Sequence, residues 1–319
     1  REVTPPQQME DRPESRKKTV IDDDINFDPA AVEAALHKLQ SNKAPGPDDI
    51  HPMLLKECAA ELAYPISRIY QKSFDTGTLP ADWKKANISP IFKKGVRTNP
   101  ENYRPVALTS VLCKVMERMI RDRVVDYLQQ NELLNQHQHG FTKKRSCLTN
   151  LLETFEKWTE ALDEGYGVDA VYLDYRKAFD TVPIQRLLQK IKYYGIGGRI
   201  YDWLKDFLTA RWTRVNVRGA WSIWREVLSG VPQGSVLGPI LFIIFVNDLP
   251  DWMKCKIKLF ADDTKIWTKI GKKEDQNELQ EDLDRIMEWT DRWLLRLNPD
   301  KCKVMHIGHQ MDTKYYLKG

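Results

Sequence analysis

The sequence predicts an α+β protein. The chain has 319 residues, which is enough for a sizeable hydrophobic core and two or three subdomains. Hydrophobic residues make up 42% and charged residues 29% of the sequence, a balance typical of soluble globular proteins rather than disordered or fibrous ones. Helical and strand-like patterns both occur without strict alternation, which favours an α+β architecture over a regularly alternating one.

Helical periodicity begins near residue 28. Asp28 can cap the first helix, and Pro29 suits its first turn. A loop with three prolines and a glycine follows at 42–52. Further helices are predicted at 53–74, 110–131, 147–162, 184–195 and 277–297, and strands at 168–175, 213–219, 224–230 and 256–261.

The ends and the composition suggest the setting of the chain. Residues 1–24 are polar and contain prolines, which predicts a linker. Because the chain starts at Arg1 rather than Met, we expect an excised part of a longer protein. The longest apolar run, 236–246, is interrupted by glycine and proline and is shorter than the roughly 20 residues of a membrane span. The five scattered cysteines contain no CxxC pair, which indicates a reducing, intracellular compartment.

Two short stretches place aspartate at the expected ends of strands. In 168–175 the strand alternation brings Asp174 to the rim of a sheet. In "KLFADDTKIW", two alternating segments flank Asp262 and Asp263, which predicts a hairpin with both carboxylates at its tip. Taken alone, Asp-Asp at a turn is ordinary turn chemistry. Three converging carboxylates repel one another unless a divalent cation lies between them, and Mg²⁺ binds carboxylates together with phosphate oxygens. The hypothesis is therefore a two-metal site for nucleotidyl transfer.

A third segment, 229–249, has closely spaced glycines and prolines before a stretch too apolar to be an exposed helix. Gln233 offers a hydrogen-bond donor and an acceptor where this irregular backbone passes close to another group. A glycine-rich turn before a buried helix is the alternative explanation.

Seven segments, taken in order, resemble the reverse transcriptase of non-LTR (LINE-type) retrotransposons, with the jockey-like and chicken-repeat-like group most similar. The resemblance runs from about Ile25 to the end of the chain. It implies a right-hand polymerase fold in which helices back an antiparallel sheet, with a fingers region at 25–160 and a palm region at 161–319, and with 229–249 at their junction. We expect the thumb and the endonuclease domain of this family to be absent from the chain. The segments are "NKAPGPDDI", "PIFKKG" with "NYRPVALTS", "HGFTKKRS", "VYLDYRKAFDTV", "SGVPQGSVLGPILF", "FADD" and "LNPDKCKVM".

The resemblance assigns the catalytic metal ligands. It implies that Asp174, Asp262 and Asp263 are the carboxylates of the palm, helped by the backbone carbonyl of Tyr175. Asp174 and Asp262 are the better candidates for direct ligands, because neighbours at a hairpin tip cannot both aim ideally. Phe179 stands where this class places an aromatic ring against the sugar to exclude a 2′-hydroxyl; ordinary core packing is the alternative for this residue.

The resemblance also assigns contacts to the incoming deoxynucleoside triphosphate (dNTP). Lys94 and Arg104 would bind its phosphates, Lys93 is nearly as good a candidate as Lys94, and Gln233 would contact the nucleotide. Lys301 falls where the family places a lysine proposed to protonate the leaving pyrophosphate. A lysine in a solvated turn explains Lys301 equally well.

The implied activity is that of an RNA-directed DNA polymerase, which extends a primer 3′-hydroxyl with dNTPs and uses two Mg²⁺ ions, with Mn²⁺ as a possible substitute. The implied partners are an RNA template and a DNA primer or target, in the nucleus or a cytoplasmic ribonucleoprotein. Two alternatives stay open. An RNA-templated RNA polymerase is opposed by segment 229–249 and by Ala261, where those enzymes usually have glycine. A domesticated or truncated, catalytically weak nucleic-acid-binding copy predicts lost carboxylates, whereas all three are intact.

Overall fold

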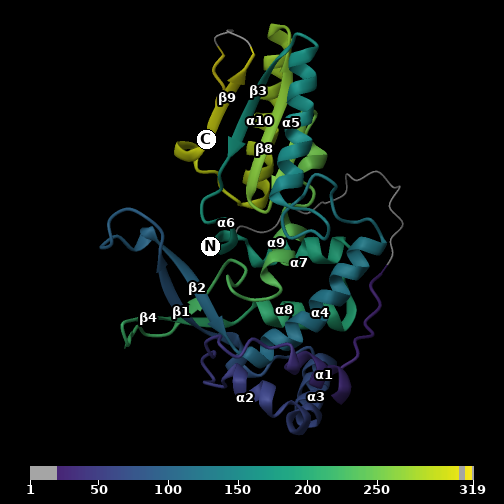
Figure 1. The fold of residues 1–319 in the computed structure, drawn as a ribbon, viewed down its shortest axis with the longest axis vertical. Coiled ribbons are helices and arrows are strands. Elements are labelled where there is room, and N and C mark those ends of the chain that lie inside the picture. The colour runs from purple at the N-terminus through teal and green to yellow at the C-terminus, as the bar shows by residue number, and fades with distance from the viewer. Residues whose placement is uncertain (1–19, 309–312, 318–319) are drawn as a thin grey trace. The chain divides into compact units, whose positions relative to one another are not determined.

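The computed structural model describes residues 20–308 and 313–317, and these combine helices with two sheets, which confirms the predicted mixture (Figure 1). The described residues form two compact units, each made of separate stretches of chain. Unit 1 comprises 132–187 and the described residues from 239 onward, and unit 2 comprises 20–131 and 188–238. The names fingers and palm, and the boundaries predicted for them, stay predictions.

Most of the predicted linker, residues 1–19, lies outside the described residues. Residues 20–24 form neither helix nor strand. Ile21 is nevertheless buried, and its N–H donates to the carbonyl of Gly195 at 3.0 Å. The last residues of this stretch therefore pack within unit 2.

Unit 1 is built on a four-stranded antiparallel sheet. Its strands are β3 (Gly167–Leu173), β7 (Lys256–Phe260), β8 (Asp263–Ile270) and β9 (Lys303–Ile307), and its helical segments are α5 (Cys147–Asp163), α6 (Ala178–Thr181), α9 (Gly238–Val246), η3 (Leu249–Trp252), α10 (Lys273–Trp293) and η4 (Pro299–Lys301). The strand order is β7-β8-β3-β9. β3 lies inside the sheet, where it pairs with β8 on one side and β9 on the other. It therefore joins the first stretch of this unit, 132–187, to the stretch that starts at 239.

Apolar side chains alternate along β3 as the period of two requires. Val168 and Ala170 pack with Trp158 of α5 and Trp267 of β8, and the two indole rings lie 6.3 Å apart. Helix α10 runs along β8 (Figure 1). The apolar helix α9 is buried over nearly its whole length, as predicted for the segment that follows the glycine-rich turn.

Unit 2 contains the second sheet, in the order β2-β1-β4-β5, with β6 also paired to β4. Its strands are β1 (Lys85–Phe92), β2 (Tyr103–Thr109), β4 (Arg211–Val217), β5 (Ala220–Trp221) and β6 (Arg225–Val227), and its helical segments are α1 (Pro29–His37), α2 (Pro52–Glu57), α3 (Ala59–Thr76), η1 (Ala81–Lys84), η2 (Pro100–Asn102), α4 (Val111–Gln130) and α8 (Gly198–Leu208). Helix α7 (Ile184–Tyr193) begins in unit 1 and ends in unit 2. The sheet is a β1–β2 hairpin extended by β4, which runs parallel to β1.

Helix boundaries follow local chemistry. The side chain of Asp28 accepts a hydrogen bond from the N–H of Ala31, so this residue caps α1 as predicted. The predicted helix at 53–74 is two helices, because Cys58 leaves helical geometry between α2 and α3. Apolar periodicity does not detect such a one-residue interruption. No helix among the described residues is long and apolar enough to cross a membrane.

Candidate active site

The structure brings two of the predicted carboxylates to neighbouring strand ends. Asp174 directly follows β3, and Asp263 is the first residue of β8. Because Leu173 pairs with Thr264, the next residues along this antiparallel pair are Asp174 and Asp263. Partial burial, and then the charge of Asp174, raise the pKa of the Asp263 carboxyl above its usual value. The strand ends therefore hold interacting negative charges.

Asp262 lies beside them in the tight turn that joins β7 to β8. Phe260 and Asp263 pair across this turn, which leaves Ala261 and Asp262 at its tip. The predicted hairpin is confirmed, but the placement of both carboxylates at its tip is wrong, because Asp263 is already the first residue of β8. Ala261 has a φ of 57°, in the left-handed region that costs a residue with a Cβ about 1 kcal/mol or more. Something must hold this turn in place.

A buried glutamine holds the turn. Gln138 is 2% exposed, and its Oε1 accepts hydrogen bonds from the N–H groups of Gly140 at 2.8 Å and Ala261 at 2.9 Å. A Cβ on Gly140 would lie 2.3 Å from the nitrogen of Ala261, so only glycine allows this approach. The sequence pattern gives Gln138 one signal only, its position directly before the "HGF" of one family segment, and Gln138 was not predicted to have a role.

Lys301 reaches the same cluster from the other side of β3. Its Nζ lies 3.3 Å from Oδ1 of Asp174, and its side chain is 62% exposed. The N–H of Asn298 donates to the backbone carbonyl of Asp174 at 2.7 Å, which places η4 beside this strand end. The structure therefore brings Lys301 to the carboxylates, in contact with Asp174 rather than alone in a solvated turn.

Tyr175 is buried beneath the cluster, and burial raises the pKa of its phenol. Its backbone pairs with Leu297. The two hydrogen bonds that flank this pair use the carbonyls of Asp174 and Arg296. Neither bond uses the carbonyl of Tyr175, the atom that the resemblance assigns to a metal.

Phe179 lies in α6, five residues beyond Asp174 in the chain, and its ring is partly buried. It stacks on the fully buried ring of Phe242 in α9, with centroids 4.3 Å apart and an interplanar angle of 17°. Core packing therefore accounts for one face of this ring. The contact also fixes the orientation of the ring.

The donor chemistry of the cluster fits magnesium. No three His, Cys, Asp or Glu side chains among the described residues form a group that holds a metal unaided. Mg²⁺ does not need such a cage, because it takes one or two carboxylates and completes its shell with water and substrate phosphates. The mutual repulsion of Asp174 and Asp263 is the electrostatic condition that a bound cation relieves.

The predicted phosphate contacts lie in unit 2, on the β1–β2 hairpin. Arg104 pairs with Ile91 across the hairpin, and the N–H of Lys93 donates to the carbonyl of Asn102 at 2.9 Å. Lys93, Lys94 and Arg104 are all exposed. Three cationic side chains are thus available to solvent near one end of a rigid hairpin.

Gln233 belongs to unit 2 and is held by its backbone. Its carbonyl accepts a hydrogen bond from the N–H of Ala107 in β2 at 2.9 Å. Gly234 has a φ of 108°, and a Cβ there would lie 2.5 Å from the carbonyl oxygen of Ala107. The close approach of backbones that the glycines predicted is therefore present.

A buried glutamate that was not predicted to have a role fixes the rest of this segment. Glu117 of α4 is fully buried and accepts hydrogen bonds from the N–H groups of Val236 at 2.7 Å and Leu237 at 3.1 Å. Burial raises the pKa of its carboxyl, against the opposing effect of these bonds. Its signal in the sequence was an acidic residue on the apolar face of a predicted helix.

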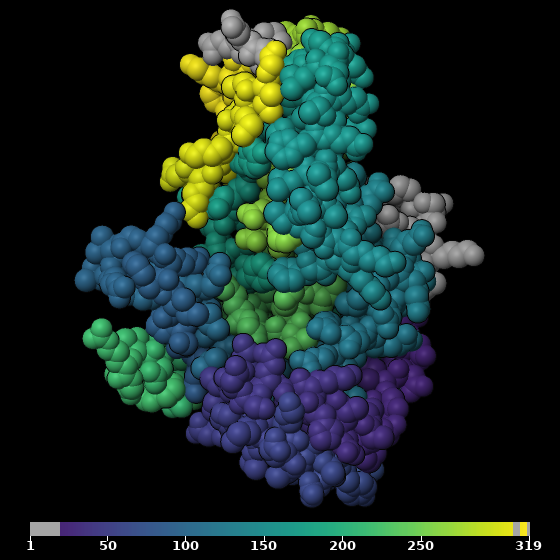
Figure 2. Space-filling model, in the orientation of Figure 1, coloured from purple at the N-terminus to yellow at the C-terminus, as the bar shows by residue number. Residues whose placement is uncertain are grey.

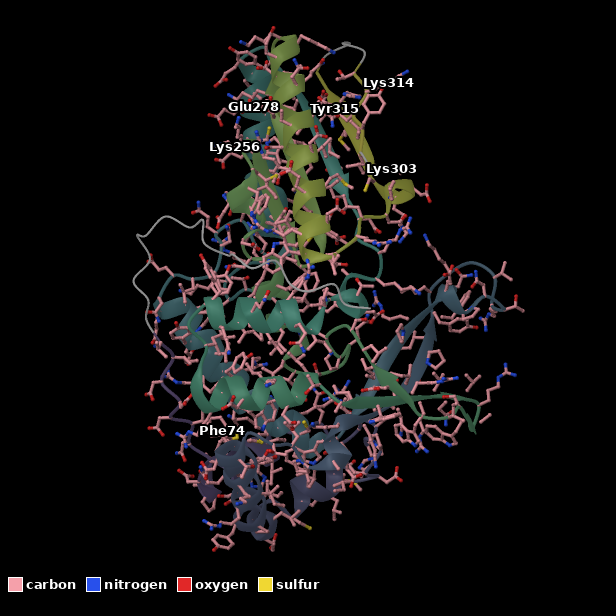
Figure 3. All side chains as sticks on the ribbon, turned by 180° about the vertical axis from the view of Figure 1, so that it is seen from behind. Phe74, Lys256, Glu278, Lys303, Lys314 and Tyr315 are labelled. Atoms are coloured by element: carbon pink, nitrogen blue, oxygen red, sulfur yellow. The ribbon has the colours of Figure 1, made fainter. Side chains whose placement is uncertain are left out.

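Unit 1 contains a second carboxylate network on β3. Asp169 is 0% exposed; its Oδ1 lies 2.5 Å from Nδ1 of His306 in β9, and its Oδ2 accepts a hydrogen bond from the hydroxyl of Tyr315 at 2.5 Å. The rings of His306 and Tyr315 stack with centroids 6.4 Å apart, and Figure 3 shows Tyr315 beside the strand that begins at Lys303. Burial, and then Asp169, raise the pKa of the Tyr315 hydroxyl. This network ties β9 and residues 313–317 to β3.

An antiparallel sheet that carries acidic residues at adjoining strand ends, with an Ala-Asp-Asp turn, is the arrangement that the resemblance predicts for a template-directed polymerase. The family model described as "Reverse transcriptase (RNA-dependent DNA polymerase)" matches residues 91–317. The chain therefore belongs to the reverse transcriptase family, and the predicted resemblance is confirmed.

Similar proteins come from mobile elements of Drosophila melanogaster. The "Probable RNA-directed DNA polymerase from transposon BS" is 33% identical over 286 residues, and the "RNA-directed DNA polymerase from mobile element jockey" is 32% identical over 281 residues. Each match covers 85% of this chain and 31% of the relative. A third, the "Probable RNA-directed DNA polymerase from transposon X-element", is 31% identical over 86% of this chain and 31% of the relative. The chain thus spans about a third of the length of these relatives.

Proposed function

We propose that the chain is the catalytic core of an RNA-directed DNA polymerase of a non-LTR retrotransposon. The observation that carries the proposal is the meeting of Asp174 and Asp263 at paired strand ends, with Nζ of Lys301 at 3.3 Å from Asp174. An exposed acidic cluster with one adjacent ammonium group suits a reaction that joins a hydroxyl to a polyanionic substrate. In this proposal unit 1 contains the palm, and the β1–β2 hairpin belongs to the fingers.

Asp174 and Asp262, with the Tyr175 carbonyl and with Asp263 nearby, would hold two Mg²⁺ ions. Bound in this way, the metal supplies activation of the primer hydroxyl and charge stabilisation of the leaving pyrophosphate. Gln138 serves this arrangement indirectly, because it fixes the turn that carries Asp262. The carboxylates are thus preorganised by the hairpin and do not have to be ordered by the substrate.

The other residues bind and orient the nucleotide. Lys94 or Lys93, together with Arg104, pairs with triphosphate oxygens, and Gln233 hydrogen-bonds the nucleotide. Phe179, held by its stacking on Phe242, excludes a 2′-hydroxyl by steric overlap. The ammonium group of Lys301 donates its proton to the oxygen that departs with pyrophosphate.

The substrates would be an RNA template, a DNA primer or target and dNTPs. Such an element acts where its RNA meets DNA, so the nucleus or a ribonucleoprotein is the proposed location.

Primer extension on a homopolymeric RNA template with Mg²⁺ tests the proposal. We expect extension with dNTPs and much weaker extension with ribonucleotides. Preference for ribonucleotides would indicate an RNA-templated RNA polymerase instead. Template binding without any extension would indicate a catalytically weak nucleic-acid-binding copy.

A further inference from the structure

The arm formed by residues 211–228, which contains β4, β5 and β6, is unusually apolar for an exposed segment. Trp221 is 48% exposed and Ile223 is 68% exposed. Figure 2 shows part of this arm (green) at the surface beside the β1–β2 hairpin (blue). Exposed apolar side chains gathered on one segment mark an interaction site. The large exposed apolar residues of the arm are Trp212, Val215, Val217, Trp221, Ile223 and Leu228.

The charge of the arm is mostly positive. Residues 211–228 include four arginines and one acidic residue, the exposed Glu226, which pairs with Trp212. Arg211 is buried and donates to the carbonyl of Phe207, so it supports the fold. Arg218 and Arg225 are exposed. Exposed aromatic rings in a segment with an excess of positive charge fit a polyanion that also carries flat rings, which is the description of a nucleic acid.

One arginine holds two of the indole rings in place. The guanidinium of Arg214 lies 4.0 Å from the ring centroid of Trp221 and 4.6 Å from that of Trp224. Its Nε donates to Oδ1 of Asn87 in β1 at 2.9 Å, and Asn87 is buried. The exposed ring of Trp221 is therefore anchored to the sheet, and its preorganisation lowers the entropy cost of binding a ligand.

The register places these groups on one face of the sheet. Arg214 pairs with Asn87, and Asn216 pairs with Trp221. Asn87 and Ile91 are four residues apart on β1 and so share a face, and Ile91 pairs with Arg104. Trp221 and the predicted phosphate contact Arg104 are thus on the same side, whereas Arg225 pairs with Thr213 and belongs to the opposite face. Arg218 lies in the turn between β4 and β5, three residues before Trp221.

We propose that this face of the arm is a platform for single-stranded RNA, with a base stacked on the exposed ring of Trp221 and a backbone phosphate paired with Arg218. Single-stranded nucleic acid is required, because bases inside a duplex are not free to stack on a side chain. That this RNA is the template rests on the proposed function. The binding itself does not.

The experiment measures fluorescence anisotropy of labelled single-stranded RNA of about a dozen nucleotides, without Mg²⁺ or dNTPs. Trp221→Leu is expected to weaken binding by about ten-fold, the loss typical of one base–aromatic stack, and Trp221→Phe to keep most of the affinity. Trp252→Leu is the matched control, since Trp252 also lies near an arginine, Arg292, but in unit 1. It is expected to bind like the parent.

A second pair of variants tests the face. Arg218→Gln is expected to lower the slope of log affinity against log salt by about 1, and Arg225→Gln, with the same change in charge on the opposite face, to change it less. Duplex RNA of equal length should respond little to Trp221→Leu. Melting curves identify variants that unfold. If Trp221→Leu unfolds, the proposal is tested by RNA binding of Trp221→Phe and by the comparison of Arg218→Gln with Arg225→Gln.

Equal RNA affinity in the parent and in folded Trp221→Leu and Arg218→Gln would overturn the proposal and leave a protein partner as the candidate for the arm. Failure of the proposed function gives a different result: no primer extension in the parent, with Trp221-dependent RNA binding intact. Primer extension by the parent, together with RNA binding that does not depend on Trp221, would overturn the RNA platform and leave the proposed polymerase function standing.

Discussion

Two aspartates five positions apart, one within β3 and one directly after it, have opposite environments. Asp169 lies in the middle of β3, is 0% exposed, and binds both His306 and Tyr315. Asp174 follows the end of β3, its side chain is 37% exposed, and it faces Asp263 and Lys301. A buried carboxylate with such partners stabilises the fold, whereas an exposed carboxylate beside another negative charge can bind a cation or substrate. Environment, and not residue type, separates the structural aspartate from the candidate catalytic one.

The largest effect is expected at the hairpin tip. Asp262→Asn should lower primer extension by at least about a hundred-fold, since loss of even one preorganised hydrogen-bond donor from an active site costs that much. The fold should persist, because Asp262 lies in a turn and one repelling charge is removed. Extension rates and a melting curve provide the measurement. Activity within a few-fold of the parent would remove Asp262 from the site.

Asp169 should show the opposite profile. Asp169→Asn is expected to lower the free energy of unfolding by about 3 kcal/mol, because a buried carboxylate with two hydrogen-bonding partners, His306 and Tyr315, loses one of its two acceptor oxygens. Extension per folded molecule should change far less than in Asp262→Asn. Asp300→Asn, an exposed aspartate in η4, is the control and should stay within about 0.5 kcal/mol of the parent. Unchanged stability in Asp169→Asn would mean that the network does not support the sheet.

Phe179 combines both roles, so its variant should show both effects. Phe179→Val should reduce discrimination against ribonucleotides by about ten-fold or more, because the clash with the 2′-hydroxyl is relieved. It should also lower stability, because the stack on Phe242 is lost. Phe242→Leu is the control, since it weakens the same stack from the buried side. The ratio of incorporation efficiencies for the two sugars, measured beside melting curves, separates a folded variant with an altered ratio from one that is merely destabilised.

The smallest effect concerns the pH dependence of stability. The pKa of Asp263 is raised in the folded state, so ionised Asp263 disfavours folding above that pKa and costs nothing below the usual value of 3.8. Asp263→Asn should therefore raise the free energy of unfolding at pH 7, by less than about 1 kcal/mol because the exposed carboxyl is screened by solvent. The gain should vanish as the pH falls below about 4. A gain that grows on acidification would contradict the assigned repulsion.

Local pattern was enough to predict the positions of two of the three candidate carboxylates. The alternation in β3 and the paired segments around the turn place Asp174 at a strand end and Asp262 in a hairpin turn without any long-range information; Asp263, predicted at the tip of the turn, is the first residue of β8 instead. The strands of the hairpin that carries Arg104 were not predicted from the sequence pattern, because β2 contains a proline and lacks clean alternation.

The supporting residues were not predicted, because their roles depend on contacts between distant parts of the chain. Gln138 holds a residue 123 positions away, Glu117 one 119 positions away, and Asp169 one 137 positions away. The division into two units was not predicted for the same reason. Each unit joins stretches that are far apart in the sequence, and composition does not indicate which distant stretches pack together. Asp169 and Glu117 could have been noticed as polar residues at positions where the sequence pattern predicts burial. The pattern does not indicate which distant residue forms a hydrogen bond with either of them.

The central claim is that the exposed carboxylates of the strand ends, and not the buried one within β3, hold the divalent metal. Electron paramagnetic resonance of free Mn²⁺, titrated with the protein, tests it directly. The parent and Asp169→Asn, at a temperature where both are folded, should remove Mn²⁺ from solution alike. The double variant Asp174→Asn and Asp262→Asn should lose this binding. Equal binding by the double variant and the parent would contradict the account.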